Sequence, residues 1–201
     1  AVAFRAGDIV LEGELFVPVL GARTGVIICH PHPLYGGDMD NNVVMALFEK
    51  FRSAGYACLR FNFRGVGRSE GTHDDGNAEQ ADVKAAIGYL LSRQPLESVA
   101  VAGYSFGSIV GLRAGADDPR VHKLIGVALP IARRDASFLK RVSKPKLLIS
   151  GDRDDVSPAE TIKALADKIP DPKEAVIVAG ADHFFRGYED LAADIATRFL
   201  A

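Results

Sequence analysis

The chain has 201 residues, of which 48% are hydrophobic and 25% charged, and its formal net charge is −2. These values are typical of one globular domain, residues 1–201, with a sizeable core. The small net charge, without any basic run, argues against a nucleic-acid partner and against binding to an anionic membrane surface. No apolar stretch approaches the roughly 18 residues that a membrane span needs, so we expect no membrane association.

The two cysteines, Cys29 and Cys58, both lie within apolar runs. This position predicts small buried thiols and no structural disulfide, which suits a reducing cytoplasm. Residues 1–5 lack the long apolar core of a signal peptide. We therefore expect a cytoplasmic protein.

Short apolar segments alternate with amphipathic segments along the chain. The apolar segments predict strands at residues 2–5, 9–17, 25–30, 58–63, 99–102, 123–129, 146–150 and 175–179. The amphipathic segments predict helices at residues 43–53, 78–93, 106–115, 158–168 and 188–200. Either Asn41 or Asn42 can cap the first helix. The residues of the second helix that we expect to face inward are Ala81, Ala85, Ile87, Leu90 and Leu91.

This alternation predicts an α/β fold, a mostly parallel sheet of about seven to eight strands flanked by helices. The first two segments are expected to form a hairpin near the sheet edge, because the second alternates apolar and polar residues. In parallel sheets, ligands bind beyond the carboxyl ends of the strands. The unusual loops of this chain all follow predicted strands, at residues 30–37, 103–107, 151–158 and 180–185. We expect the functional site where these loops converge.

The segment Gly103-Tyr-Ser-Phe-Gly107 joins a predicted strand to a predicted helix. G-x-S-x-G at such a junction predicts a sharp turn that holds Ser105 in a strained backbone conformation. The two glycines lack a Cβ, so the strand and the helix can approach closely. The hydroxyl of Ser105 would then point away from the sheet end, and the backbone N–H of Phe106 would face a developing oxyanion.

A serine hydroxyl is a weak nucleophile that needs a base within reach and a third group to orient the base. Two histidines follow this turn in the sequence. His122 precedes a predicted strand and is expected on the far side of the sheet, whereas His183 follows the last strand. The acid is expected from the loop after the seventh strand, which contains Asp152, Asp154 and Asp155. The resulting chain order is serine, aspartate, histidine.

Taken together, these motifs resemble the α/β-hydrolase superfamily, and most of all its small, lidless, dienelactone-hydrolase-like serine hydrolases. The resemblance covers nearly the whole chain. It is carried by G-Y-S-F-G and by H-P-H-P at residues 30–33, F-x-F-R-G-x-G-x-S-x-G at 61–71, G-D-x-D-x-V-x-P at 151–158 and G-x-D-H-F-F at 180–185. In the family the acid usually stands third after the glycine, so the resemblance implies Asp154, with Asp152 and Asp155 as rivals.

The resemblance also implies a second oxyanion donor in the loop that begins at His30. If His30 aligns with the family's H-G-x, the donor is the N–H of His32. If His32 aligns there, it is the N–H of Leu34, the alternative that we favour. Pro31 and Pro33 have no N–H. His30 and His32 also suggest a metal pair, but no third ligand clusters with them in the sequence, so we expect no metal.

The activity implied by the resemblance is hydrolysis of a small or short-acyl carboxylic ester through an acyl-enzyme, without a cofactor. Ser105 would attack the carbonyl, His183 would act as general base and then general acid, and Asp154 would orient the imidazole. A thioesterase, a small peptidase and a non-catalytic binding protein of this fold are the alternatives. Many relatives insert a helical lid where this chain has only residues 131–145, too short and polar a segment for one, so we expect no lid.

Overall fold

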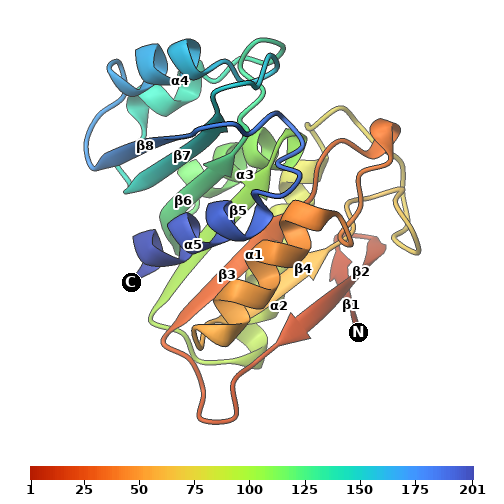
Figure 1. Ribbon diagram of the computed structural model, residues 1–201. Coiled ribbons are helices and arrows are strands. Elements are labelled where there is room, and N and C mark those ends of the chain that lie inside the picture. Colours follow the sequence, from red (N-terminus) through yellow and green to blue (C-terminus); the bar gives the residue numbers. More distant parts are fainter.

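The computed structural model describes residues 1–201 as one eight-stranded sheet flanked by five α-helices (Figure 1). The strands are β1 (Val2–Ala6), β2 (Ile9–Phe16), β3 (Thr24–Cys29), β4 (Ala57–Phe61), β5 (Ser98–Tyr104), β6 (Val121–Val127), β7 (Lys146–Gly151) and β8 (Lys173–Val178). The α-helices are α1 (Asn42–Ser53), α2 (Glu79–Arg93), α3 (Phe106–Ala116), α4 (Ala159–Ala166) and α5 (Glu189–Leu200). Two short 3-10 helices are η1 (Pro33–Tyr35) and η2 (Ser137–Arg141).

The strands lie in the order β1-β2-β4-β3-β5-β6-β7-β8. β2 pairs antiparallel with β1 and with β4, and every other neighbouring pair is parallel. The predicted α/β sheet with an N-terminal edge hairpin is therefore confirmed. From β3 the chain crosses to β4 on one side and then returns to β5 on the other side of β3. Ligand crevices form where strand order reverses in this way, and the loops that begin at His30 and Ser105 both lie at this point.

Helices cover both faces of the sheet, because continuously apolar strands such as β3 must be buried on both sides. On one face α1 and α5 lie side by side (Figure 1), and their Phe48, Phe51 and Ala196 pack in one apolar core. On the other face α2, α3 and α4 cover a second core, which contains Ile87 and Leu112. The sheet is thus held between two helical layers, and only its strand ends are free for function.

The start of α1 helps to place the loop at the end of β8. Oδ1 of Asn41 accepts a hydrogen bond from the N–H of Val43 at 3.0 Å, so Asn41 is the helix cap. The side chain of Asn42 instead donates to Glu189 at 2.7 Å and to the carbonyl oxygen of Phe184 at 3.3 Å. These bonds connect α1 to the segment that leads into α5.

The inward face of α2 differs from the prediction. Of the five residues expected to face inward, Ala81 is exposed, and only Ile87 and Leu90 are buried. Two charged side chains, Glu79 and Asp82, are fully buried near the start of the helix. The cause is the preceding loop, which folds over this end of α2 and supplies backbone N–H donors to Glu79 and a guanidinium to Asp82.

No lid covers the carboxyl ends of the strands. Residues 131–145 contain only η2, as the shortness of this segment predicts. None of the five α-helices combines the length and the apolar character needed to cross a lipid bilayer. Cys29 and Cys58 are buried free thiols, which confirms that prediction.

Candidate active site

β5 and α3 meet in a tight turn at Ser105. Its φ of 51° and ψ of −121° are sparsely populated by residues with a side chain, at a cost of about 1–3 kcal/mol. A Cβ on Gly103 would lie 2.3 Å from the carbonyl oxygen of Gly107, and a Cβ on Gly107 would lie 2.4 Å from the carbonyl oxygens of Cys29 and His30. The two glycines therefore allow the turn and let the loop of His30 pack against the first turn of α3.

Ser105, His183 and Asp154 come together from the loops after β5, β8 and β7. Oγ of Ser105 lies 2.9 Å from Nε2 of His183. Nδ1 of the same imidazole lies 2.9 Å and 3.0 Å from the two carboxylate oxygens of Asp154. The side chain of Asp154 is fully buried and that of His183 is 13% exposed, so little water competes for these contacts.

The surroundings of Asp154 define which nitrogen of His183 carries the proton. Oδ1 of Asp154 also accepts hydrogen bonds from the backbone N–H groups of Val156 at 2.9 Å and Ser157 at 2.7 Å. A carboxylate held by such donors accepts a further hydrogen bond from Nδ1–H of the imidazole. The lone pair of the neutral ring is then on Nε2 and faces the hydroxyl of Ser105, which is the tautomer that a general base requires.

The other carboxylates of these loops do not contact His183. Oδ1 of Asp152 accepts from the N–H of Gly180 at 2.7 Å, which ties the loop after β7 to the loop after β8. Asp155 is exposed. Asp182 accepts from the N–H of Phe184 at 3.0 Å. Of the three aspartates that the sequence offers after β7, only Asp154 lies against the imidazole.

Tyr104 is a site residue that the sequence analysis missed. Its hydroxyl donates a hydrogen bond to the carbonyl oxygen of His183 at 2.8 Å. Burial raises the pKa of Tyr104, so the hydroxyl keeps its proton and remains a donor. The strand that carries Ser105 therefore also holds the backbone of His183. The only signal in the sequence is that Tyr104 lies inside G-x-S-x-G.

Free N–H groups lie near Ser105 at the start of α3. The backbone N–H groups of Phe106 and Gly107 donate to no acceptor within the protein. Unpaired N–H groups in the first turn of a helix attract negative charge. They can therefore bind an oxyanion that forms at a carbonyl attacked by Ser105.

The N–H of Leu34, the second oxyanion donor that we favoured, has another partner in the structure. Its N–H donates to Nδ1 of His32 at 3.2 Å within η1, and its side chain is 74% exposed. The backbone N–H of His32, in contrast, donates to no acceptor within the protein, and His32 lines the same cavity as Ser105. This loop therefore fits better the alignment of His30 with the family's H-G-x, which implies the N–H of His32, because the N–H of Leu34 is used in the cap of η1.

His30 has a structural position. Its Nδ1 donates to the carbonyl oxygen of Pro31 at 2.7 Å, and its Nε2 accepts from the N–H of Phe63 at 3.0 Å. Burial lowers the pKa of His30 to about 4, so the ring is neutral at pH 7. Both nitrogens are engaged, which leaves His30 unable to join His32 in a metal site. It instead links the end of β3 to the segment after β4.

Ser105 and His183 open into a cavity of about 1040 Å³. Its apolar surface includes Tyr35 and Phe184, whose rings are largely exposed at the mouth. Most other lining side chains are polar or charged, among them Asn41, Asn42, Arg133, Arg134, Arg186 and Glu189. The cavity therefore offers many hydrogen-bonding groups beside its apolar side chains.

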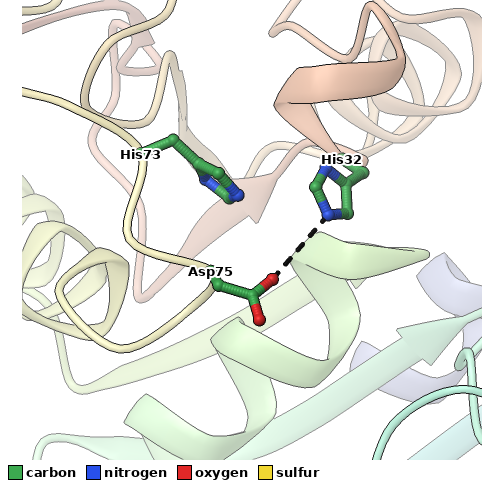
Figure 2. Close-up of side chains that lie close together, drawn as sticks. All are labelled: His32, His73 and Asp75. Carbon is green, nitrogen blue, oxygen red and sulfur yellow. Dashed lines mark ion pairs between the residues drawn. The ribbon is translucent and has the colours of Figure 1, made fainter.

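One group of side chains beside this cavity could hold a metal ion. His32, His73 and Asp75 each bring a ligand atom within 4.8 Å of the other two (Figure 2). His73 and Asp75 belong to the loop between β4 and α2, and the sequence analysis assigned neither residue a role. The short run His73-Asp-Asp75 was the only signal, since no sequence pattern places this loop against His32.

Comparisons with known proteins agree with the fold. The sequence model of the α/β-hydrolase fold family matches residues 26–133, more than half of the chain. An uncharacterized protein of Rickettsia prowazekii is 34% identical over 169 residues, which cover 80% of this chain and 71% of that protein.

Two solved structures are similar over almost the whole chain. One is a protein of unknown function from Agrobacterium tumefaciens with the α/β-hydrolase fold, 34% identical with a TM-score of 0.92, covering 99% of this chain and 94% of that one. The other is an α/β serine hydrolase without a lid from Xanthomonas campestris, 29% identical with a TM-score of 0.88, covering 99% and 92%. The present chain likewise has no lid. It belongs to the α/β-hydrolase fold family.

Proposed function

We propose that the protein is a serine hydrolase that cleaves carboxylic esters with small or short acyl groups. The observation that carries this proposal is the hydrogen-bonded chain from Ser105 through His183 to Asp154. Its tautomer leaves Nε2 free to accept a proton. The likeness to a lidless serine hydrolase of Xanthomonas campestris supports the same chemistry.

In the first half of the reaction, Oγ of Ser105 attacks the acyl carbon while Nε2 of His183 takes the hydroxyl proton. The carbonyl π electrons move to the oxygen, and the N–H groups of Phe106 and His32 stabilise that oxyanion. His183 then passes its proton to the leaving alkoxide as the ester C–O bond breaks. Asp154 stays ionised throughout and stabilises the imidazolium.

In the second half, water replaces the alcohol. Nε2 of His183 removes a proton from water, the hydroxide attacks the acyl-enzyme, and the proton returns to Oγ of Ser105 as the acid leaves. No cofactor is needed for either half. The strained backbone of Ser105 supports this role, because such strain concentrates at catalytic residues.

The preference for small acyl groups is supported by the cavity walls. Without a lid, nothing closes over the apolar side chains of the cavity, and Tyr35 and Phe184 stay largely exposed at its open mouth. Each methylene that is fully buried contributes about 0.8 kcal/mol, and a long chain would find few places here to bury them. The substrate is therefore a small molecule whose acyl part is short or polar.

A fluorophosphonate probe tests the nucleophile directly, with peptide mapping of the labelled residue. We expect labelling at Ser105 in the wild type, none in Ser105→Ala, and normal labelling in the control Ser137→Ala, whose serine is exposed outside the cavity. The Ser105→Ala variant should lose about a million-fold in kcat, because members of a triad act as a unit. Labelling that persists in Ser105→Ala would overturn the assignment.

Acetyl esters, thioesters and anilides of matched leaving groups test the reaction class. We expect the highest kcat/KM on the ester. A higher value on the thioester or the anilide would make the protein a thioesterase or an amidase on the same residues. No turnover of any of them, together with no labelling by the probe, would point to a non-catalytic binding protein instead.

A further inference from the structure

Three potential metal ligands converge from two loops at the rim of the active-site cavity. His32 lies in the connection from β3 to α1, and His73 and Asp75 lie in the connection from β4 to α2. Figure 2 shows the three side chains pointing toward a common space, with Nε2 of His32 4.0 Å from Oδ1 of Asp75. The rings of His32 and His73 lie with their centroids 5.0 Å apart.

His73 presents an unused nitrogen to this space. Both ring nitrogens are buried, and neither makes a hydrogen bond of acceptable geometry. Nδ1 nevertheless lies 2.7 Å from Oε1 of the fully buried Glu79. Such a close contact with a carboxylate places the proton of a neutral ring on Nδ1. The lone pair is then on Nε2, and metal-binding histidines are typically oriented by a carboxylate on the other nitrogen in this way.

His32 is also incompletely satisfied. Its Nδ1 faces the N–H of Leu34 at 3.2 Å, and its Nε2 faces a guanidinium nitrogen of Arg134 at 3.3 Å. A neutral imidazole has only one lone pair, so it cannot accept from both donors. Protonation would not help, because the ring would then carry two N–H donors that face two other donors. One side of this ring is therefore mismatched in either tautomer.

A positive charge already stands at this site. The guanidinium of Arg134 forms an ion pair with Asp75, whose side chain is 72% exposed. Arg134 is 25% exposed and also donates to the carbonyl oxygen of Asp75 at 3.1 Å, so a metal ion must replace both this ion pair and this hydrogen bond. Arg134 is itself at the cavity wall, so it can turn toward solvent and leave both Asp75 and Nε2 of His32 to another cation.

We propose that Nε2 of His32, Nε2 of His73 and a carboxylate oxygen of Asp75 bind one zinc-class transition-metal ion, which displaces Arg134. Two imidazoles and a carboxylate suit Zn²⁺, with a fourth position left for water. Ligands about 2.0–2.2 Å from a tetrahedral ion lie about 3.4 Å apart. The side chains therefore close in by about an ångström, which loop side chains allow.

The second part of the proposal is that a metal ion bound at this site inhibits hydrolysis, and this part rests on the proposed function. A metal on Nε2 leaves the proton of His32 on Nδ1, where it faces the N–H of Leu34 and breaks the cap of η1. The backbone N–H of His32, the second oxyanion donor of the proposed mechanism, belongs to the same turn. Donors to the oxyanion act mainly in the transition state, so inhibition lowers kcat more than it changes KM.

Metal binding is tested without any reference to turnover, in the Ser105→Ala background. Co²⁺ is titrated into the protein and followed by its visible ligand-field absorption, and Zn²⁺ then displaces it. We expect one equivalent to bind. His73→Gln should weaken binding by more than the roughly 10–100-fold that loss of an outer partner costs. His122→Gln is the matched control, because His122 is exposed on β6 and remote from the cluster.

Inhibition by Zn²⁺ is tested in protein that keeps Ser105, with chelator-treated enzyme as the reference. We expect His73→Gln to hydrolyse esters within about twofold of the wild type and to have lost zinc inhibition, while His122→Gln remains sensitive. Binding that does not change in His73→Gln overturns the site. If binding weakens in His73→Gln as expected but zinc still inhibits this variant, the coupling between the metal site and hydrolysis is overturned, because zinc then acts elsewhere, for example on His183. If no variant hydrolyses esters, the proposed function fails while the binding result still stands.

Discussion

The Asp154→Asn substitution would keep the shape of the acid and remove its ability to hold the catalytic tautomer. The Oδ1 position accepts from the N–H groups of Val156 and Ser157, so the amide oxygen of the introduced asparagine must take that place. The NH₂ group is then forced into the Oδ2 position, 2.9 Å from Nδ1 of His183. A donor there makes Nδ1 the acceptor and moves the ring proton to Nε2, which can no longer take the proton of Ser105.

The expected loss in kcat is about ten-thousand-fold, equivalent to about 5 kcal/mol of transition-state stabilisation. Stability should change little, because asparagine keeps both backbone hydrogen bonds. The measurement is kcat/KM on p-nitrophenyl acetate for purified variants, with urea unfolding as a check of the fold. Asp155→Asn, at an exposed position of the same loop, is the matched control and should retain nearly full activity.

Asp152→Asn separates loop geometry from catalysis. This carboxylate bonds the N–H of Gly180, and the amide oxygen of asparagine can keep that bond. A loss of at most about tenfold is therefore expected, since one neutral hydrogen bond replaces a charged one. If Asp154→Asn retained more than a hundredth of wild-type activity, or if either control lost more activity than Asp154→Asn, the proposed role of Asp154 in orienting His183 would be wrong.

Three further predictions concern the loops and the cavity. Gly107→Ala would place a Cβ 2.4 Å from two backbone carbonyl oxygens, so we expect at least about 2 kcal/mol loss in urea unfolding. Gly88→Ala, where the closest atom is 3.5 Å away, should instead be neutral or stabilising. The pKa of His30 is lowered to about 4, so its ring should stay neutral by NMR down to that pH. Because the unfolded ring protonates near 6.5, folding stability should fall by up to about 3 kcal/mol as the pH drops from about 6.5 to 4. On p-nitrophenyl esters of increasing acyl length, kcat/KM should level off after about four carbons, whereas burial of each methylene would raise it about fourfold. A continued rise, or a jump when micelles form, would contradict the lidless, short-acyl proposal.

Much of the architecture was predictable because its determinants are local. Continuous apolar runs such as residues 25–30 can only be strands covered on both faces, and the helices between them force parallel pairing. Parallel strands share one carboxyl edge, so Ser105 and His183 had to lie at the same end of the sheet although 78 residues separate them. Their proximity follows from topology, and no long-range information was needed to expect it.

Which side chain of a loop points into the site was harder to predict from the sequence. The direction of Asp154 depends on two backbone N–H groups of an irregular turn, and no periodicity predicts which aspartate such a turn points inward. Likewise, no sequence pattern predicts that the N–H of Leu34 is used in the cap of η1. The family resemblance could favour Asp154, but residues and spacing alone left Asp152 and Asp155 open.

Long-range packing also explains the error in α2. Periodicity assigned Ala81 to the core because alanine is apolar, whereas the buried positions near the helix start hold Glu79 and Asp82. These carboxylates are buried only because a loop without regular structure folds over them and satisfies them. That loop also brings His73 and Asp75 to the cavity rim, so the misassigned helix face and the missed cluster have one cause.

Phe106 gives a physical reason why the cluster and the oxyanion site should respond together. Its N–H is the first oxyanion donor of the proposed mechanism, and its ring lies beneath the cluster. The ring centroid is 4.7 Å from that of His32 and 5.4 Å from that of His73, and the guanidinium of Arg134 lies 5.0 Å above it. Any ligand that turns the His32 ring and expels Arg134 therefore changes two of the groups that pack on this residue. Because close-packed interiors transmit such shifts, both oxyanion donors of the proposed mechanism would be affected.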